Sequence, residues 1–324
     1  MPSPAEGSAG APSVTVAVCT RDRPDDLARC LDALQALRYP ALELLVIDNA
    51  PATADTERLV RARAGVRYAR EPRPGLDWAR NRAIAEAGGE ILAFTDDDVV
   101  VEPDWAGALA AVFRDDPRVG AVTGLVEPLE LETEAQRLFE RYRSFARGSA
   151  RVRAEAGPGT GPVAPRYGMT GSFGTGANMA FRRRLFAELG GFDPCLGAGT
   201  VTRGGDDLEI FFRVLKAGWA LVYEPAAVVR HRHRRELDEL VGQIRDHGIS
   251  FSSYVVREAA LHADERWAFA RLWAWWVSKT CYRVLRPKSA PAAPMRRLAL
   301  AELDGLVRGL GRYRRARTLM RNGR

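Results

Sequence analysis

Three consecutive aspartates, Asp96, Asp97 and Asp98, directly follow the apolar segment Ile91–Thr95. Adjacent carboxylates repel one another, so at a strand end they reduce stability unless a positive charge lies between them. A divalent cation that bridges to phosphate meets this need, because manganese and magnesium both prefer hard oxygen ligands. The alternative is a solvated acidic turn that caps the next helix. The triplet therefore indicates either a metal–phosphate site or an ordinary surface turn.

Two further strand ends carry groups suited to a nucleotide. Asp48 ends the apolar run 44–47, where a carboxylate can accept hydrogen bonds from a nucleobase or a ribose hydroxyl. The motif TRDR (20–23) supplies the hydroxyl of Thr20 and two guanidinium groups, one of them from Arg21. Each motif also has a structural alternative, an Asx turn for Asp48 and a helix cap for the TRDR motif.

The motif GGDD (204–207) precedes a helix that we expect to begin at Asp207. Two glycines permit a close backbone approach. Two adjacent acids, Asp206 and Asp207, cannot both ionise freely, so their titration should split. The structural alternative is a glycine turn followed by an N-capping aspartate.

Strands and helices alternate along the first half of the chain. Short apolar runs separated by helices of this length predict a mostly parallel sheet covered by helices on both faces. Ligands bind such sheets at the carboxyl ends of the strands, where Asp96–Asp98, Asp48 and the TRDR motif lie. The expected elements are Val14–Thr20, Asp25–Leu37, Glu43–Asp48, Thr53–Arg63, Val66–Arg70, Leu76–Ala87 and Ile91–Thr95.

The second half is less regular. We expect a Gly- and Pro-rich lid or acceptor loop over 148–167, and a helical pattern from Glu236 to the end. The remaining expected elements are strands at Asn178–Phe181 and Ala220–Tyr223, and helices at Arg183–Leu189 and from Asp207. The domains predicted are a tail over 1–12, an α/β domain over 13–235 and a helical extension over 236–324.

The composition is that of an ordinary globular protein, since 46% of its 324 residues are hydrophobic and 27% are charged. Its four widely spaced cysteines and the lack of a signal peptide lead us to expect a cytoplasmic protein with reduced thiols. From Arg230 onward there are 21 Lys and Arg against 9 Asp and Glu, whereas the preceding residues carry a net charge of −5. The basic part suits an anionic membrane surface, a phosphorylated acceptor or a solvated helix face, and no nucleic-acid module is present.

Six motifs in a fixed order resemble the inverting family 2 glycosyltransferases with the GT-A fold, of the non-processive bacterial type. Together they cover about two-thirds of the chain, from Val14 to His233. The QxxRW motif of the processive enzymes in this family is missing, so the resemblance implies addition of a single sugar. The motifs are CTRDRPDDL, LLVIDNA, RPGLDWARN, FTDDD, GTGANMAFRR and GGDDLEIFFR.

The resemblance implies a role for each matching residue. On the donor side, Asp98 would ligate a manganese or magnesium ion on the diphosphate of a nucleotide sugar. His231 would complete the metal site, with His233 as the neighbouring alternative and a surface histidine as the structural one. The residues expected around the nucleoside and the donor sugar are Thr20, Arg21, Asp48, Arg73, Gly75, Arg80, Asn81, Asp96 and Asp97.

On the acceptor side, the resemblance implies that Asp207 is the general base and that Asp206 binds or orients the acceptor. An attacking hydroxyl is a poor nucleophile until a carboxylate removes its proton, which fits this assignment. Asn178, in the small-residue turn GTGAN (174–178), is expected near the acceptor, and the structural alternative is that this turn is simply a loop.

The expected reaction is transfer of a sugar from a UDP- or dTDP-sugar to a hydroxyl acceptor, which can be lipid-linked. One alternative, a nucleotidyltransferase, lacks its usual glycine-rich, lysine-bearing N-terminal loop here. The other is a catalytically silent protein that binds a glycan or nucleotide with the same fold. The tryptophans of 267–276 should pack the helical extension against the α/β domain, or else place the protein at the inner face of a membrane. A membrane-spanning segment is not expected, because charges interrupt this stretch.

Overall fold

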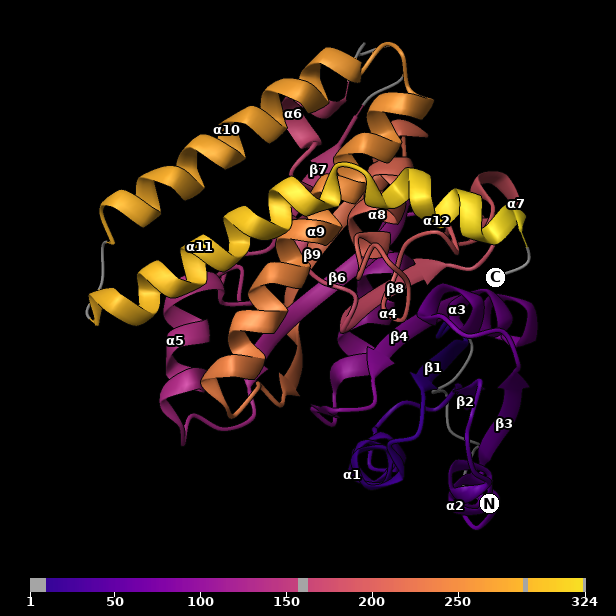
Figure 1. Cartoon of the computed structure of the whole chain (residues 1–324). Coiled ribbons are helices and arrows are strands. Elements are labelled where there is room, and N and C mark those ends of the chain that lie inside the picture. Colours follow the sequence, from indigo (N-terminus) through magenta and orange to yellow (C-terminus); the bar gives the residue numbers. More distant parts are fainter. Residues whose placement is uncertain (1–9, 157–162, 288–290, 323–324) are drawn as a thin grey trace, which may run out of the picture.

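The computed structural model describes residues 10–156, 163–287 and 291–322 (Figure 1). Most of the predicted tail, residues 1–9, and the centre of the predicted lid, residues 157–162, lie outside this range. The described part of the lid contains a short strand, β7 (Val152–Glu155), and a short helix, α6 (Ala164–Tyr167).

The first four strands form the parallel half of one sheet, as the sequence predicted. β1 pairs in parallel with both β2 and β4, and β2 pairs in parallel with β3. The strands are β1 (Val14–Thr20), β2 (Leu42–Asn49), β3 (Val66–Glu71) and β4 (Ile91–Asp96). The helices that connect them are α1 (Pro24–Gln35), α2 (Asp55–Arg61) and α3 (Leu76–Glu86).

The second half of the sheet mixes parallel and antiparallel pairs. The strand order is β3-β2-β1-β4-β8-β6-β9-β5, and β7 also pairs with β9. β4 is antiparallel to β8, whereas β6 and β9 are parallel. These strands are β5 (Val99–Val101), β6 (Val119–Pro128), β8 (Asn178–Arg182) and β9 (Ala220–His231). The elements between them are α4 (Trp105–Asp115), α5 (Glu134–Arg143), the 3-10 turn η1 (Thr170–Phe173), α7 (Leu185–Leu189) and α8 (Asp206–Lys216).

Alternating side chains of the strands supply two apolar cores, one on each face of the sheet. Val16 and Val18 pack with α1 and α4 on one face, whereas Ala17 faces the other core. That second core also contains Phe211 of α8 and Phe269 of the C-terminal helices. The C-terminal helices therefore share a core with the sheet.

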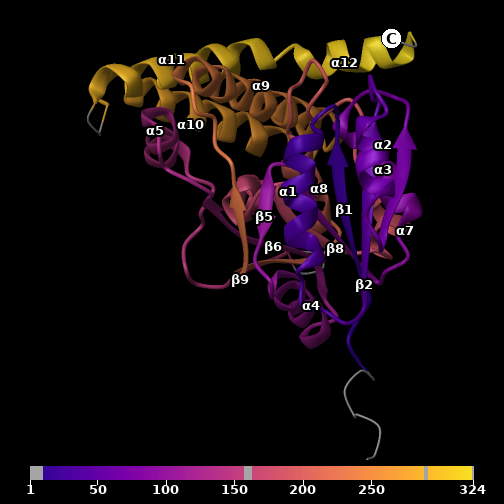
Figure 2. The same ribbon diagram turned by 90° about the horizontal axis from the view of Figure 1, so that it is seen from below.

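The C-terminal helices form a layer across one side of the sheet domain (Figure 2). They are α9 (Leu237–Leu261), α10 (Arg266–Leu285), α11 (Ala292–Gly309) and α12 (Arg312–Arg321). α9 and α11 approach closely through glycines, since a Cβ at Gly305 would lie 2.0 Å from the Arg245 carbonyl oxygen. None of the helices in the described part of the chain is long and apolar enough to cross a membrane.

The four tryptophans of α10 at positions 267–276 differ in burial. Trp276 is buried and Trp273 is half-buried, so both pack the helical layer against the sheet domain. Trp267 and Trp275 are 74% and 49% exposed. The prediction that these side chains pack against the α/β domain is therefore right for two of the four.

Candidate active site

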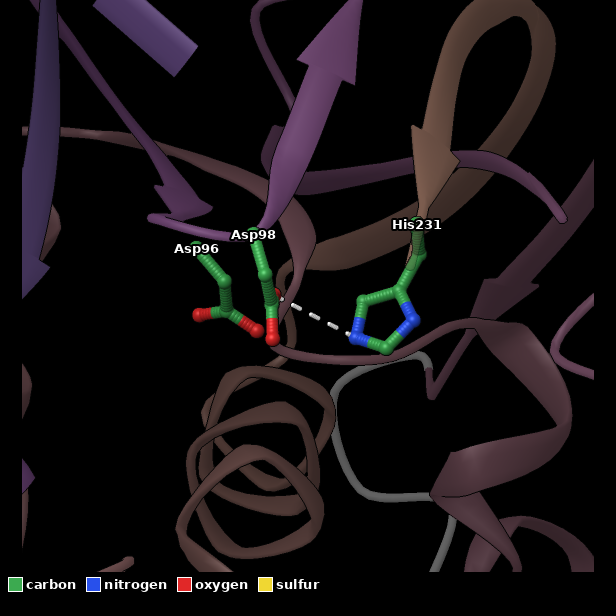
Figure 3. Close-up of side chains that lie close together, drawn as sticks. All are labelled: Asp96, Asp98 and His231. Atoms are coloured by element: carbon green, nitrogen blue, oxygen red, sulfur yellow. Dashed lines mark ion pairs between the residues drawn. The ribbon is translucent and has the colours of Figure 1, made fainter. Parts of the chain in front are cut away.

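The pairing of the strands brings Asp96, Asp98 and His231 together. Asp96 is the last residue of β4, and Asp98 directly precedes β5. β5 runs antiparallel to the end of β9, with Val99 opposite His231. The histidine therefore faces the aspartates, although it lies more than 130 residues further along the chain (Figure 3).

These three side chains have the geometry of a metal site. One ligand atom of each lies within 4.8 Å of the others, and His231 Nε2 is 3.4 Å from Asp98 Oδ1. The side chains of His231 and Asp98 are only 12% and 10% exposed. Two carboxylates and an imidazole suit manganese or magnesium. The donor set therefore fits a divalent cation.

The electrostatics agree with this fit. Burial and the neighbouring Asp98 raise the pKa of Asp96 to about 6. Burial also acts to raise the pKa of Asp98, but His231 and Arg23 outweigh it, and the net shift of that pKa is downward. No hydrogen bond from a described residue reaches the Asp96 carboxylate. A cation would remove the repulsion that the two aspartates now exert on each other.

His233, the alternative ligand, is turned away from the aspartates. Its Nε2 lies 2.8 Å from Glu140 Oε1, and its ring packs against Phe139 at 4.6 Å. The imidazole is 3% exposed. Of the two histidines, His231 is the one that the fold places at the aspartates.

The middle aspartate of the triplet has a different role from its neighbours. Asp97 accepts hydrogen bonds from Thr20 Oγ1 at 2.7 Å and from Arg23 Nη1 at 2.6 Å. Arg23 also reaches Asp98, with Nη2 3.1 Å from Oδ2. Arg23 belongs to the TRDR motif, but it is not one of the predicted site residues. The contacts show that it offsets the charge of the triplet.

A cavity of about 330 Å³ opens over these groups. Arg21 is half-exposed at its edge, and Arg234, a residue the sequence analysis did not select, also contributes. The carboxylates lie in the cavity floor, beside cationic groups that suit a diphosphate. Its polar and charged lining residues are Thr20, Arg21, Arg23, Asn49, Asp96, Asp97, Asp98, His231 and Arg234.

Asp48, which was predicted to bind the nucleoside, is fully buried and does not line this cavity. Tyr68 donates a hydrogen bond of 2.9 Å to its Oδ2, but Oδ1 has no partner among the described residues. Burial raises the pKa of this carboxyl, although the bond from Tyr68 opposes the shift. The neighbouring Asn49, which the prediction omitted, accepts from the Gly75 amide and donates to the Arg73 carbonyl, and so fixes the turn before α3.

A second cavity of about 620 Å³ adjoins the first, and Leu76, Asp96 and Ala198 line both. Asp207, in the first turn of α8, faces this second cavity. Each of its carboxylate oxygens accepts one backbone N–H, from Gly176 at 3.1 Å and from Leu208 at 2.8 Å. These bonds hold the carboxylate in one orientation.

Asp206 and Arg80 form a buried ion pair beside Asp207. The side chain of Arg80 is 4% exposed, and its Nη1 also lies 3.6 Å from Asp77. Burial raises the pKa of Asp77 to about 8, against the opposing effect of Arg80. Arg80 therefore compensates the charge of Asp206. The predicted split titration of Asp206 and Asp207 did not take this cation into account.

Besides Asp48, three predicted residues line neither cavity. Arg73 pairs with Glu71 and lies 3.8 Å over the Trp78 ring, outside the donor pocket where we expected it. Asn81 exchanges hydrogen bonds with the backbone of Phe192 at 2.9 and 2.7 Å. The Asn81 side chain thus connects α3 to the segment after α7 and has a structural role.

Asn178 is likewise a structural residue, contrary to the prediction of an acceptor contact. Its amide donates to the carbonyls of Leu125 at 3.0 Å and Ala227 at 2.8 Å, and its oxygen accepts from Trp105 Nε1 at 2.8 Å. The side chain is fully buried. The three hydrogen bonds of its amide group connect Asn178 to β6, β9 and α4. The side chain lines neither cavity.

Sequence comparison places the chain in a family. The model for "Glycosyl transferase family 2" matches residues 15–190, more than half of the chain. The chain belongs to this family, as the six motifs indicated.

Two relatives share a quarter of the aligned residues. The pre-mycofactocin glycosyltransferase of Mycobacterium tuberculosis is 27% identical over 245 residues, covering 75% of this chain but 48% of that protein. The chain thus spans about half the length of this relative. The glucosyl-dolichyl phosphate glucuronosyltransferase of Haloferax volcanii is 25% identical over 255 residues, covering 70% of this chain and 72% of that protein.

Solved structures confirm the fold. The mannosyltransferase PcManGT from Pyrobaculum calidifontis, in complex with GDP-Man and Mn²⁺, superposes with a TM-score of 0.60 at 19% identity, covering 92% of this chain and 87% of that one. GalNAc-T7, solved with UDP, GalNAc and Mn²⁺, gives a TM-score of 0.55 at 16% identity, covering 85% of this chain and 58% of that one. The α/β domain therefore has the GT-A fold, with helices added at its C-terminus.

Proposed function

We propose that this protein transfers one sugar from a nucleoside diphosphate sugar to a hydroxyl of an acceptor, with inversion at the anomeric carbon. The observation that carries the proposal is the junction of the two cavities at Asp96. One cavity holds the candidate metal ligands and the arginines, and the other holds Asp207. A sugar lying at the junction would have its leaving group on one side and its acceptor on the other.

The smaller cavity would bind the donor. Asp98 and His231 would hold a manganese or magnesium ion, with Asp96 beside them. When bound, the ion would supply positive charge to the diphosphate as the bond to the sugar breaks. Arg21 and Arg234 lie where they can contact the diphosphate oxygens. Two structural neighbours were solved with nucleotides and Mn²⁺, which supports the metal requirement.

The nucleobase would lie near Asp48. Its Oδ1 is buried without a partner, and an unsatisfied buried acceptor is costly unless a ligand donates to it. An N–H group of uracil, thymine or guanine would supply that donor. We propose a UDP- or dTDP-sugar, and the nucleotide panel described below distinguishes it from a GDP-sugar. The neighbours themselves hold a guanine nucleotide in one case and a uracil nucleotide in the other.

The larger cavity would bind the acceptor, with Asp207 as the general base. The acceptor oxygen forms its bond to the anomeric carbon as the bond from that carbon to the diphosphate oxygen breaks, and the hydroxyl proton passes to Asp207. The amides of Gly176 and Leu208 hold the carboxylate in place for this step. A positioned base of this kind contributes about 10²- to 10⁴-fold in rate. The ion pair between Arg80 and Asp206 would keep the neighbouring carboxylate from competing for the proton.

The outer face of α10 supports a peripheral membrane contact at the cytoplasmic side. Trp267 and Leu285 of this helix are exposed, and so are Arg271 between them and Arg286 directly after the helix. Amphipathic helices with aromatic and basic residues bind the interface of anionic membranes. We therefore propose that the acceptor is presented at such a surface, as a lipid-linked hydroxyl compound.

A thermal-shift panel of nucleoside diphosphates, each with and without manganese, tests the proposed function. The expected result is stabilisation by one nucleotide, dependent on the metal, through preferential binding to the folded state. A folded protein that no nucleotide stabilises would favour the alternative of a silent binding protein. The nucleotide that shifts the melting temperature then selects the sugar nucleotides for an assay of nucleoside diphosphate release.

A further inference from the structure

A cluster of cationic side chains surrounds one buried tryptophan in the wall of the larger cavity. Arg143 of α5 and Arg283 of α10 lie over the ring of Trp276, with their guanidinium carbons 5.2 and 5.8 Å from its centroid. Lys279 Nζ lies 4.9 Å from the same centroid. All four residues line the cavity that Asp207 faces. We call these residues the tryptophan cluster.

One buried carboxylate holds the cluster together. Glu302 of α11 is fully buried and accepts from Arg143 Nη1 at 2.8 Å, Arg283 Nη1 at 3.2 Å and Trp276 Nε1 at 3.1 Å. Tyr142 adds a fourth bond of 2.6 Å. These bonds join α5, α10 and α11, so the carboxylate has a structural role. Its single charge is shared by two guanidinium groups.

The two guanidinium groups of the cluster therefore carry more positive charge than Glu302 compensates. Within the described residues, Arg143 and Arg283 each donate Nη1 to this one carboxylate, and Arg283 also bonds to the Tyr142 side chain. Both side chains are 27% exposed. The positive charge also affects neighbouring cavity residues, since burial and the charge of Arg143 lower the pKa of both Arg147 and His247.

We propose that the tryptophan cluster binds a phosphate group of the acceptor, while the acceptor hydroxyl lies at Asp207. This inference rests on the proposed function and names the chemistry of its second substrate. Guanidinium groups bind phosphate oxygens through several N–H groups at once, and a phosphate carries about −1.5 to −2 charges near neutral pH. Trp275 lines the same cavity and adds an apolar surface beside the anion. A phosphate on a lipid carrier and one on a water-soluble acceptor share this chemistry.

Direct binding measurements by calorimetry, in metal-free buffer and without any nucleotide, test the proposal. The probes are phenyl phosphate, farnesyl phosphate and the neutral farnesol. Wild-type protein should bind both phosphates, and Arg283→Gln and Lys279→Gln should each weaken that binding at least tenfold. Farnesyl phosphate binding much more tightly than phenyl phosphate would identify a lipid carrier, and equal affinities would identify a soluble acceptor.

Matched variants control for general charge effects. Arg271→Gln removes one charge from the exposed side of α10, outside the cavity, and should leave the affinities unchanged. Arg21→Gln makes the same change in the smaller cavity and reports any phosphate that binds there. Arg283→Lys keeps the charge next to Glu302 and should retain most of the binding, and melting curves establish that each variant is folded.

Two results would overturn the proposal. One is equal phosphate affinity in wild type and in folded Arg283→Gln and Lys279→Gln. The other is a loss confined to Arg21→Gln, which would place the phosphate in the donor cavity. Because the measurement needs neither donor nor turnover, its outcome is independent of whether the thermal-shift panel finds a nucleotide.

Discussion

The two cavities that meet at Asp96 are built from different parts of the chain. The smaller one is lined by strand ends and the turns directly after them, such as 19–23 and 96–98. The larger one combines the turn before α8 with side chains of α5, α9 and α10. The GT-A sheet thus supplies the groups that can bind a nucleotide and metal, whereas the added helices α9 and α10 supply part of the wall of the larger cavity.

We propose that the two cavities perform different tasks, with diphosphate binding in the smaller one and acceptor selection in the larger one. Holding a diphosphate requires carboxylates and cations at fixed positions, and parallel strand ends provide these within a few residues of sequence. Selecting an acceptor requires a shaped wall, and here it depends on Glu302, which joins three helices from the buried side. Variants that affect only one cavity test this division.

The largest effect should follow from removal of the carboxylate behind the larger cavity. Glu302→Ala leaves the guanidinium groups of Arg143 and Arg283 next to each other without a counter-charge, and breaking such a buried pair costs about 3–5 kcal/mol. The melting temperature should fall markedly. Nucleotide binding, measured below the new transition, should persist. Loss of nucleotide binding in the folded variant would show that the two cavities are not separable.

A second variant addresses the smaller cavity. Asp98→Ala removes one of the three proposed metal ligands, and metal-dependent nucleotide affinity should fall by about 100-fold, or roughly 3 kcal/mol. Calorimetric titration with manganese present measures the change. Asp104→Ala is the matched control, because this exposed carboxylate pairs with Arg38 on the surface and lines neither cavity. Equal affinities in wild type and Asp98→Ala would remove Asp98 from the metal site.

Asn178→Ala tests the structural role assigned to a residue that sequence reasoning placed near the acceptor. The change leaves the indole N–H of Trp105 and two carbonyls buried without partners, so stability should fall by about 1–3 kcal/mol. Denaturant unfolding measures this loss. Turnover per folded molecule should stay within about twofold of wild type. A stable variant with impaired turnover would restore the acceptor role.

The smallest effect concerns the outer face of α10. Trp267→Ser removes a side chain that is 74% exposed, and binding to vesicles of anionic lipid should weaken by roughly threefold, less than 1 kcal/mol. Co-sedimentation with anionic and neutral vesicles measures the binding. Leu300→Ser, at an exposed position of α11, should have no effect. Equal binding of wild type to neutral and anionic vesicles would contradict the proposed contact.

Local patterns explain why part of this structure was predictable. The alternation of β1 to β4 with α1 to α3 is visible in short apolar runs, and their parallel pairing places Thr20, Asp48 and Asp96 at one sheet edge. The family motifs then assign roles to those positions. The prediction for β9 was too short, since the strand was expected over Ala220–Tyr223 and extends to His231. Its pairing with β6 shifts register beyond Glu224, so the second part of the strand does not continue the pattern of the first.

Long-range packing accounts for what the sequence did not show. His231 and His233 are equivalent in the run RHRHRR, and only the pairing of β5 with β9 selects His231. Asn81 and Asn178 belong to motifs of the family, yet both are saturated by distant backbone groups. The tryptophan cluster joins residue 143 to residues 276, 279 and 283 and is held by residue 302, and no local pattern connects these three parts of the chain.

The most direct test of the central claim compares donor binding and turnover in Asp207→Asn. The substitution preserves the size of the side chain and one of its two contacts to backbone amides, but it removes the proton acceptor from the larger cavity. We predict a donor dissociation constant within about twofold of wild type, and release of nucleoside diphosphate slower by about 10²- to 10⁴-fold. Turnover at the wild-type rate would contradict the assignment of Asp207 as the base, and with it the division of the site into a donor and an acceptor cavity.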